Sequence, residues 1–154
     1  WRRLPLSRAV NGGPAGAGAN LALACDIVVA GKCSNFVEVF CKLGRIPDTG
    51  GSWHLPRLVG HARAMGMAML GEKISAEKAE QWGLIWKCVP DESLMEQAMA
   101  MATHFSTAPT KGLAFTKPAP QASYGNTLEQ KLELEGQMSA ERGITSYTPR
   151  GGAA

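Results

Sequence analysis

The sequence lacks the features of several protein classes. No hydrophobic run approaches the roughly 20 apolar residues that a membrane-spanning helix needs. Charged residues make up only 19%, and the net charge of +3 is too small and scattered to indicate nucleic-acid binding. The four cysteines form no C-x-x-C pair and the three histidines are scattered, so we expect no metal site. Unpaired thiols are typical of a reducing cytoplasm, where we expect the protein to reside.

What the sequence does contain is an ordinary globular composition with one glycine-rich stretch. Apolar residues account for 45% of the 154 positions, enough for a single packed core. The stretch NGGPAGAGANLALACD, from Asn11 to Asp26, crowds small residues ahead of a helical pattern. A dinucleotide-binding fingerprint would need a third glycine where Leu21 stands. A phosphate-binding P-loop would need Lys-Ser or Lys-Thr after Gly18, where Ala19 and Asn20 stand instead.

The glycine stretch therefore predicts a tight turn leading into a helix, with two possible roles. The first N–H groups of a helix have no partner inside the helix, and the helix dipole favours negative charge there. Such a turn suits an oxygen that becomes anionic during a reaction, as in an oxyanion hole. Small residues also permit close packing of the turn against a neighbouring strand. The residues alone leave both roles open.

Strand and helix patterns alternate along the chain, which predicts the α/β class. Strands are expected at Leu6–Val10, Ile27–Ala30 and Leu84–Val89, and helices at Ala19–Ala24, Leu55–Leu70, Ser75–Gln81, Asp91–Phe105 and from Thr127 onward. The segment Phe36–Leu43 fits either a strand or a helix, and Gly44–Trp53 reads as a loop.

The loop RIPDTGGSW contains a single acid, Asp48. One interpretation is a general acid or base whose ionisation is tuned by apolar neighbours. The other is a side-chain cap for a helix that begins near Gly50. The residue pattern does not choose between them.

Longer motifs carry a resemblance to a known family. AVNGGPAGAGANLALACDIVVA, KLGRIPDTGGSWHLPRLVGHARA and MLGEKISAEKAEQWGLIWKCVP resemble the enoyl-CoA hydratase/isomerase (crotonase) superfamily, from about Ala9 to Phe105 and more loosely to Arg142. The resemblance implies a crotonase-like α/β fold. It implies a partial crotonase core at 1–105 and a helical trimerisation region at 106–142, with a disordered or altered tail at 143–154.

The resemblance also assigns roles to residues. The second of the family's two oxyanion-hole N–H groups falls on Ala17, flanked by Gly16 and Gly18, which keep the backbone accessible to substrate. Asp48 falls where isomerases of the family place their catalytic acid. The two glutamates that activate water in hydratases fall on Asn20, which is not a base, and on an aromatic residue.

That aromatic residue is Phe40, which is no base either, so the resemblance disfavours hydration. The resemblance implies that Phe40, Leu43 and Pro47 contact the acyl group, although Phe40 and Leu43 equally suit a simple packing role.

KLGRIPDTGGSW, ARAMGMAMLG and EQWGLIWKCV are most similar to the family's phenylacetate-degradation isomerases. These convert 1,2-epoxyphenylacetyl-CoA to the oxepin thioester and also shift double bonds in enoyl-CoA. The resemblance implies an enzyme with one Asp acid/base, an acyl-CoA substrate and no cofactor beyond the coenzyme A of that substrate. A non-catalytic acyl-CoA-binding protein is the alternative, and an enoyl-CoA hydratase is a weaker one.

The chain also departs from the family at its ends. The family's preceding β-α-β section, which supplies the first oxyanion N–H and much of the coenzyme A site, has no counterpart here, so we expect a fragment that is inactive alone. The full-length parent is expected to form a homotrimer or a dimer of trimers. Ser7 and Arg8 stand where the family has a buried apolar strand.

Overall fold

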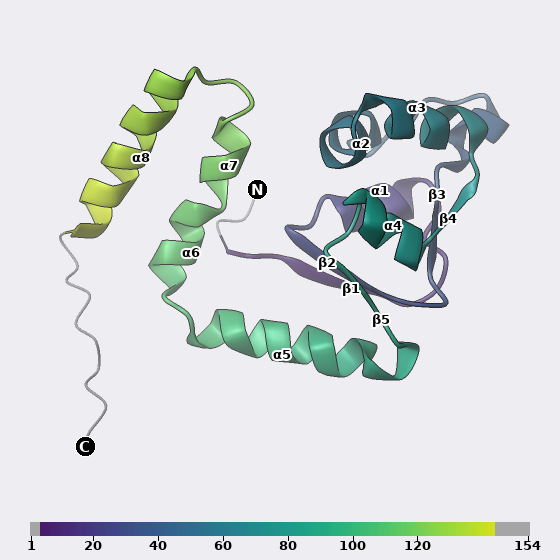
Figure 1. Ribbon diagram of the computed structural model, residues 1–154, viewed down its shortest axis with the longest axis horizontal. Coiled ribbons are helices and arrows are strands. Elements are labelled where there is room, and N and C mark those ends of the chain that lie inside the picture. The colour runs from purple at the N-terminus through teal and green to yellow at the C-terminus, as the bar shows by residue number, and fades with distance from the viewer. Residues whose placement is uncertain (1–3, 144–154) are drawn as a thin grey trace. The chain divides into compact units, whose positions relative to one another are not determined.

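A computed structural model describes residues 4–143 of the chain (Figure 1). They form two compact units: Leu6–His104, and the described residues on either side of it. The first unit contains β1 (Ser7–Val10), α1 (Ala17–Leu23), β2 (Ile27–Gly31), β3 (Asn35–Val37), the 3-10 helix η1 (Val39–Leu43), α2 (Gly51–Val59), α3 (His61–Leu70), β4 (Lys73–Ser75), α4 (Ala76–Trp82), β5 (Lys87–Val89), the 3-10 turn η2 (Asp91–Ser93) and most of α5 (Leu94–Thr107).

A parallel sheet with the strand order β1-β2-β5 forms the centre of this unit. Ser7 pairs with Ile27, and Val29 pairs with Lys87. The β-branched run in β2 suits a strand that is covered on both faces. The predicted first strand is confirmed despite Ser7 and Arg8, because β1 lies at the sheet edge and buries only Val10 fully. The predicted strand at Leu84–Val89 is shorter than expected and covers only β5.

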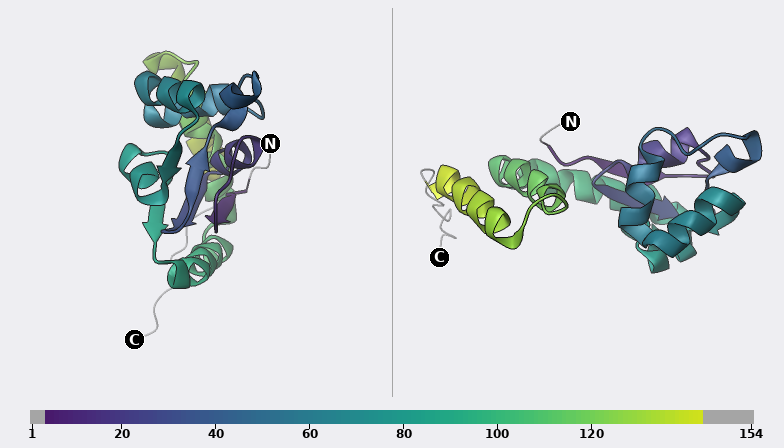
Figure 2. Two further views of the ribbon diagram at one scale, coloured as in Figure 1. Left: turned by 90° about the vertical axis from the view of Figure 1, so that its right-hand side faces the viewer. Right: turned by 90° about the horizontal axis from the view of Figure 1, so that it is seen from above.

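Successive residues of β2 point to opposite faces of the sheet and so feed two cores. Val28 and Ala30 join a large core that includes Ala19 and Leu23 of α1, whereas Val29 joins a smaller core with Leu94 of α5. The ribbons show the same arrangement, with α1 and α4 on one side of the sheet and α5 on the other (Figures 1 and 2).

The region between β2 and α4 differs from the sequence prediction. The ambiguous segment at 36–43 is part strand and part 3-10 helix, since β3 ends at Val37 and η1 follows. The predicted loop at 44–53 is wrong in its last part, because α2 already begins at Gly51. The single helix predicted at 55–70 is also wrong. It is two helices, divided at Gly60, whose φ of 78° and ψ of 165° interrupt the helical path.

The helix predicted from Ser75 is confirmed in its caps as well as its extent. The Ser75 hydroxyl oxygen accepts a hydrogen bond from the Lys78 N–H at 3.2 Å, and Gly83 ends α4 in the left-handed conformation.

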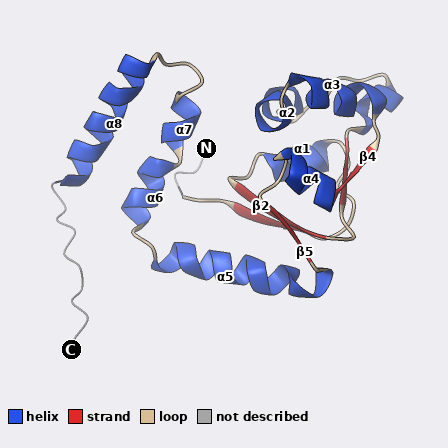
Figure 3. Ribbon diagram, in the orientation of Figure 1, coloured by secondary structure: helices blue, strands red, loops and turns tan. Residues whose placement is uncertain are grey.

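The second unit is helical, as Figure 3 shows by colour. It contains α6 (Thr110–Thr116), α7 (Pro118–Ala122) and α8 (Leu128–Gly143). The start predicted for the last helix is confirmed by a reciprocal capping box. The Gln130 N–H donates to the Thr127 hydroxyl oxygen at 3.3 Å, and the Thr127 N–H donates to Gln130 Oε1 at 2.9 Å. The tail predicted to be disordered lies, beyond residue 143, outside the described residues.

Candidate active site

The glycine stretch lies against β3. The Gly16 N–H donates to the Val37 oxygen at 2.8 Å, and the Val37 N–H donates to the Pro14 oxygen at 3.3 Å. Gly16 has a φ of 52°, and a Cβ there would lie 3.2 Å from Val39 Cγ2. A side chain at position 16 would therefore be strained by its backbone and crowded by η1. Close packing of the turn against a strand, one of the two roles considered, is present.

The same turn leaves the start of α1 accessible. Ala17 is the first residue of α1 and is exposed, as is Gly18. A Cβ at Gly18 would meet nothing within 4 Å. Within the described residues the Ala17 N–H makes no hydrogen bond, whereas the Gly18 N–H donates to the Ala15 oxygen at 3.1 Å. The packing role thus leaves a main-chain donor available to an external acceptor.

Asp48 lies in the loop between η1 and α2, with its side chain exposed. The Thr49 hydroxyl donates to Asp48 Oδ1 at 2.7 Å. Gly50 is the N-cap of α2, which has no side-chain capping bond, so the predicted capping role of the Asp48 side chain is wrong. The loop is instead closed through the main chain, where the Gly51 N–H donates to the Asp48 oxygen at 2.8 Å.

Asn20 joins the helix that follows the glycine turn to the loop that carries Asp48. Its side chain is fully buried in α1, and its Nδ2 donates to the Asp48 main-chain oxygen at 3.0 Å. The same Nδ2 donates to Glu38 Oε2 at 3.4 Å. Since Ala17 lies on the same short helix, Asn20 connects the two predicted site segments.

Glu38, between β3 and η1, is a site residue that the sequence interpretation missed. Only 1% of its surface is exposed, although it carries a carboxyl group. The pKa of this carboxyl is raised to about 7, chiefly because burial disfavours its charged form; the hydrogen bond from Asn20 lowers the pKa, and the nearby Asp48 charge adds a smaller rise. The available signal was an acid inside the apolar run NFVEVF, where a charged residue needs a reason to be buried.

The predicted substrate-contacting side chains occupy different environments. Phe40 is buried, and its Cζ would lie 3.4 Å from a Cβ at position 16, so it packs beneath the glycine turn. Leu43 is 64% exposed on η1, and Pro47 is half-buried beside Asp48. Their contacts with an acyl group stay predictions.

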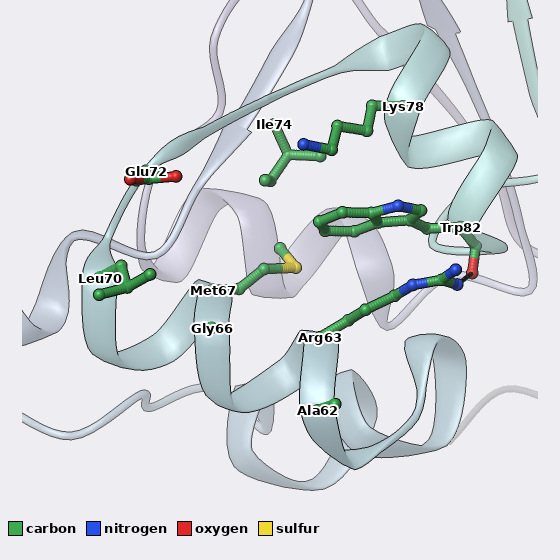
Figure 4. A pocket seen from close by; sticks show the side chains of 9 residues that line it. All are labelled: Ala62, Arg63, Gly66, Met67, Leu70, Glu72, Ile74, Lys78 and Trp82. Atoms are coloured by element: carbon green, nitrogen blue, oxygen red, sulfur yellow. Dashed lines mark hydrogen bonds between the residues drawn. The ribbon is translucent and has the colours of Figure 1, made fainter.

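A separate pocket of about 300 Å³ lies between α3 and α4 (Figure 4). Two cations lie over the Trp82 ring: the Arg63 guanidinium is 5.2 Å and the Lys78 ammonium 4.8 Å from the ring centroid. The full lining is Ala62, Arg63, Gly66, Met67, Leu70, Glu72, Ile74, Lys78 and Trp82. None of the predicted site residues contributes to it, so the candidate active site is a different place in the fold.

In the described part of the chain, His, Cys, Asp and Glu residues form no group of three or more able to hold a metal ion. Among the described helices, none has both the length and the hydropathy for crossing a membrane.

Comparison with known proteins identifies the family of this chain. Residues 3–148 match the enoyl-CoA hydratase/isomerase family model, and the chain belongs to that family, the crotonase superfamily. Its α/β architecture is the crotonase fold. A solved enoyl-CoA hydratase from Polaromonas sp. JS666 superposes with a TM-score of 0.86 at 36% identity, covering 91% of this chain and 55% of that one.

Among individual relatives, the 1,2-epoxyphenylacetyl-CoA isomerase of Escherichia coli is 53% identical over 131 residues, 85% of this chain and 50% of that protein. A probable enoyl-CoA hydratase of Rhodobacter capsulatus is 48% identical, over 91% of this chain and 54% of its own length. The chain spans about half the length of the curated relatives that it matches.

Proposed function

We propose that the intact protein carrying this chain isomerises acyl-CoA thioesters, with Asp48 as its single acid/base. The observation that carries the proposal is the accessible Asp48 carboxylate on a loop whose main chain is fixed to α1 through Asn20. One carboxylate suffices for isomerisation, because the same group can remove a proton from one carbon and return it to another.

The proposed mechanism begins with the thioester carbonyl oxygen accepting a hydrogen bond from the Ala17 N–H. Asp48 then removes a carbon-bound proton, and the negative charge that develops on the carbonyl oxygen is stabilised by that donor. In a double-bond shift, the protonated Asp48 returns the proton to another carbon of the acyl group. With a ring epoxide as substrate, the carbon–carbon bond between the two epoxide carbons breaks to give the seven-membered oxepin ring, and the protonated Asp48 returns its proton to a ring carbon, so that no atom is gained or lost.

The finer substrate assignment is the conversion of 1,2-epoxyphenylacetyl-CoA to the oxepin thioester. It is supported by the 53% identity to the Escherichia coli protein of that name. The proposal includes a homotrimer or dimer of trimers in the cytoplasm and needs no cofactor beyond the substrate's coenzyme A. Sedimentation of the intact protein tests the assembly.

Hydration is a second candidate, because several relatives are named as hydratases and because Glu38 supplies a second carboxyl group close to Asn20. Hydratases need a carboxyl that reaches the attacking water. Glu38 is only 1% exposed, and Asn20 is fully buried. The arrangement therefore supports isomerisation over hydration.

The experiment that separates the candidates follows the two products in one assay. The intact protein is given a β,γ-unsaturated acyl-CoA and, separately, the α,β-unsaturated isomer. The proposal predicts conjugation of the first and no hydroxyacyl-CoA from the second. A hydroxyacyl product from the second would favour hydration, and tight binding without either reaction would indicate a non-catalytic acyl-CoA-binding protein.

A further inference from the structure

Two buried polar side chains face each other beneath the loop that carries Asp48. Asn20 on α1 is 0% exposed and Glu38, before η1, is 1% exposed. Polar side chains are rarely buried this completely unless they form hydrogen bonds within the protein. Neither side chain has a place in the proton transfer proposed above, so their role needs a separate explanation.

The Asn20 amide has two N–H groups and uses them on two acceptors. It donates to Glu38 Oε2 at 3.4 Å and to the Asp48 main-chain oxygen at 3.0 Å. We propose that Glu38 is a positioning residue for Asp48, holding the Asn20 amide so that this amide in turn fixes the Asp48 loop. The inference rests on the proposed function, in which Asp48 is the acid/base.

The other main-chain hydrogen bonds of this loop are short-range: the Gly51 N–H donates to the Asp48 oxygen at 2.8 Å, and the Arg45 N–H donates to the Phe40 oxygen at 2.9 Å. Every residue from 44 to 50 is exposed apart from the half-buried Pro47. Thr49, next to Asp48, has a φ of 52°, which a residue with a branched Cβ adopts only at a cost in conformational energy. The hydrogen bond from the buried Asn20 side-chain amide anchors the loop from outside, and its acceptor is the main-chain oxygen of Asp48.

Asn20 and Glu38 are also matched to each other chemically. A carboxylate at position 20 would face the Glu38 carboxyl with like charge, whereas an amide can donate to it. Asn20 Oδ1 and Glu38 Oε1 both lack a hydrogen-bond partner among the described residues. A protonated Glu38 would bring an O–H donor into this buried cluster and remove the cost of a buried charge. The rise of the Glu38 pKa to about 7 on burial is consistent with that state.

Gly51 makes the anchor possible. A Cβ at position 51 would lie 2.6 Å from Asn20 Cγ and 2.7 Å from Asn20 Oδ1. Any side chain at this position would push the amide away from the Asp48 oxygen.

The test compares Glu38→Gln with Glu38→Leu in the intact protein, using a β,γ-unsaturated acyl-CoA as substrate. Gln retains an acceptor oxygen for the Asn20 amide, so kcat should stay within about twofold of wild type. Leu removes the acceptor, and kcat should fall about tenfold or more at nearly constant KM, because misplacement of a catalytic group lowers the rate of the chemical step. If Glu38→Leu does not fold, Asn20→Ala breaks the same link from the other end and should lower kcat similarly.

The double variant Asn20→Ala/Glu38→Leu then tests whether the two residues act as one unit. Its kcat should be no lower than that of the slower single variant. Three results would each overturn the positioning role. They are a double-variant loss of kcat equal to the product of the two single-variant losses, an unchanged kcat in Glu38→Leu, and a Glu38→Gln variant as slow as Glu38→Leu. Turnover retained by Asp48→Asn would instead remove the proposed acid/base, and that outcome is distinct from the others.

Discussion

The side-chain amide of Asn20 donates to the main-chain oxygen of Asp48 at 3.0 Å, across 28 residues of sequence. This bond joins the helix that begins at the proposed oxyanion donor to the loop that carries the proposed acid. The resemblance to the family implies that Asn20 stands where hydratases carry a glutamate that activates water. In this chain Asn20 instead connects two segments of the proposed site.

Replacing Asn20 by Ala should slow catalysis without abolishing it. The variant loses both hydrogen bonds and leaves the Glu38 carboxyl without its donor, which should lower the free energy of unfolding by about 1–3 kcal/mol. Turnover should fall roughly tenfold through misplacement of Asp48. Thermal unfolding and steady-state kinetics of the intact protein measure the two effects. A complete loss of turnover in a folded variant would mean that Asn20 takes part in the chemistry itself.

Replacing Glu38 by Gln should change how stability depends on pH. The folded-state pKa of Glu38 is raised to about 7 from an ordinary 4.5. Below the lower value both states are protonated. Between the two values the folded state holds a proton that the unfolded state has lost, so stability falls as the pH rises. Above about pH 7 the folded state bears the full cost of ionising the buried Glu38 carboxyl, which lowers the free energy of unfolding by about 3 kcal/mol.

The Gln variant carries no such proton and should therefore be more stable than the wild type at pH 8, with the difference disappearing towards pH 4.5. Urea unfolding of both proteins at several pH values measures this. A difference in the free energy of unfolding that stays constant across the range would show that Glu38 has an ordinary pKa in the folded protein.

Gly51→Ala should damage the site, whereas Gly66→Ala should not. The added methyl at position 51 overlaps the Asn20 side chain, and overpacking of this kind costs about 1–3 kcal/mol. A Cβ at Gly66, inside α3, meets nothing within 4 Å, so alanine there should raise helix stability by roughly 0.5–1 kcal/mol. Unfolding and kcat measured for both variants make the comparison. Equal behaviour of the two would argue against a close approach of Asn20 at position 51.

Local patterns predicted the parts of the fold whose causes are local. The cap at Ser75, the capping box at Thr127 and the strand at Ile27 follow from hydrogen bonds or side-chain shapes within a few residues. The division of the 55–70 helix at Gly60 was missed, because the apolar periodicity continues across the break while the backbone does not.

The candidate site could be predicted only in part, because some of its contacts are tertiary and leave no local sequence pattern. Ala17 and Asp48 follow from the resemblance to the family. Glu38 does not, because its importance comes from tertiary burial against Asn20, eighteen residues earlier in the chain. An acid in an apolar run signals that something is unusual, but only the folded contacts show that it faces an amide bound to the Asp48 loop.

The role of Asp48 as acid/base is tested most directly by the rate at which Asp48→Asn in the intact protein isomerises a β,γ-unsaturated acyl-CoA, with thioester binding measured alongside. Asparagine preserves the shape of the loop residue but cannot accept the proton. We expect isomerisation to be abolished while thioester affinity stays nearly unchanged. Turnover close to that of the wild type would contradict this expectation and remove Asp48 from its proposed role.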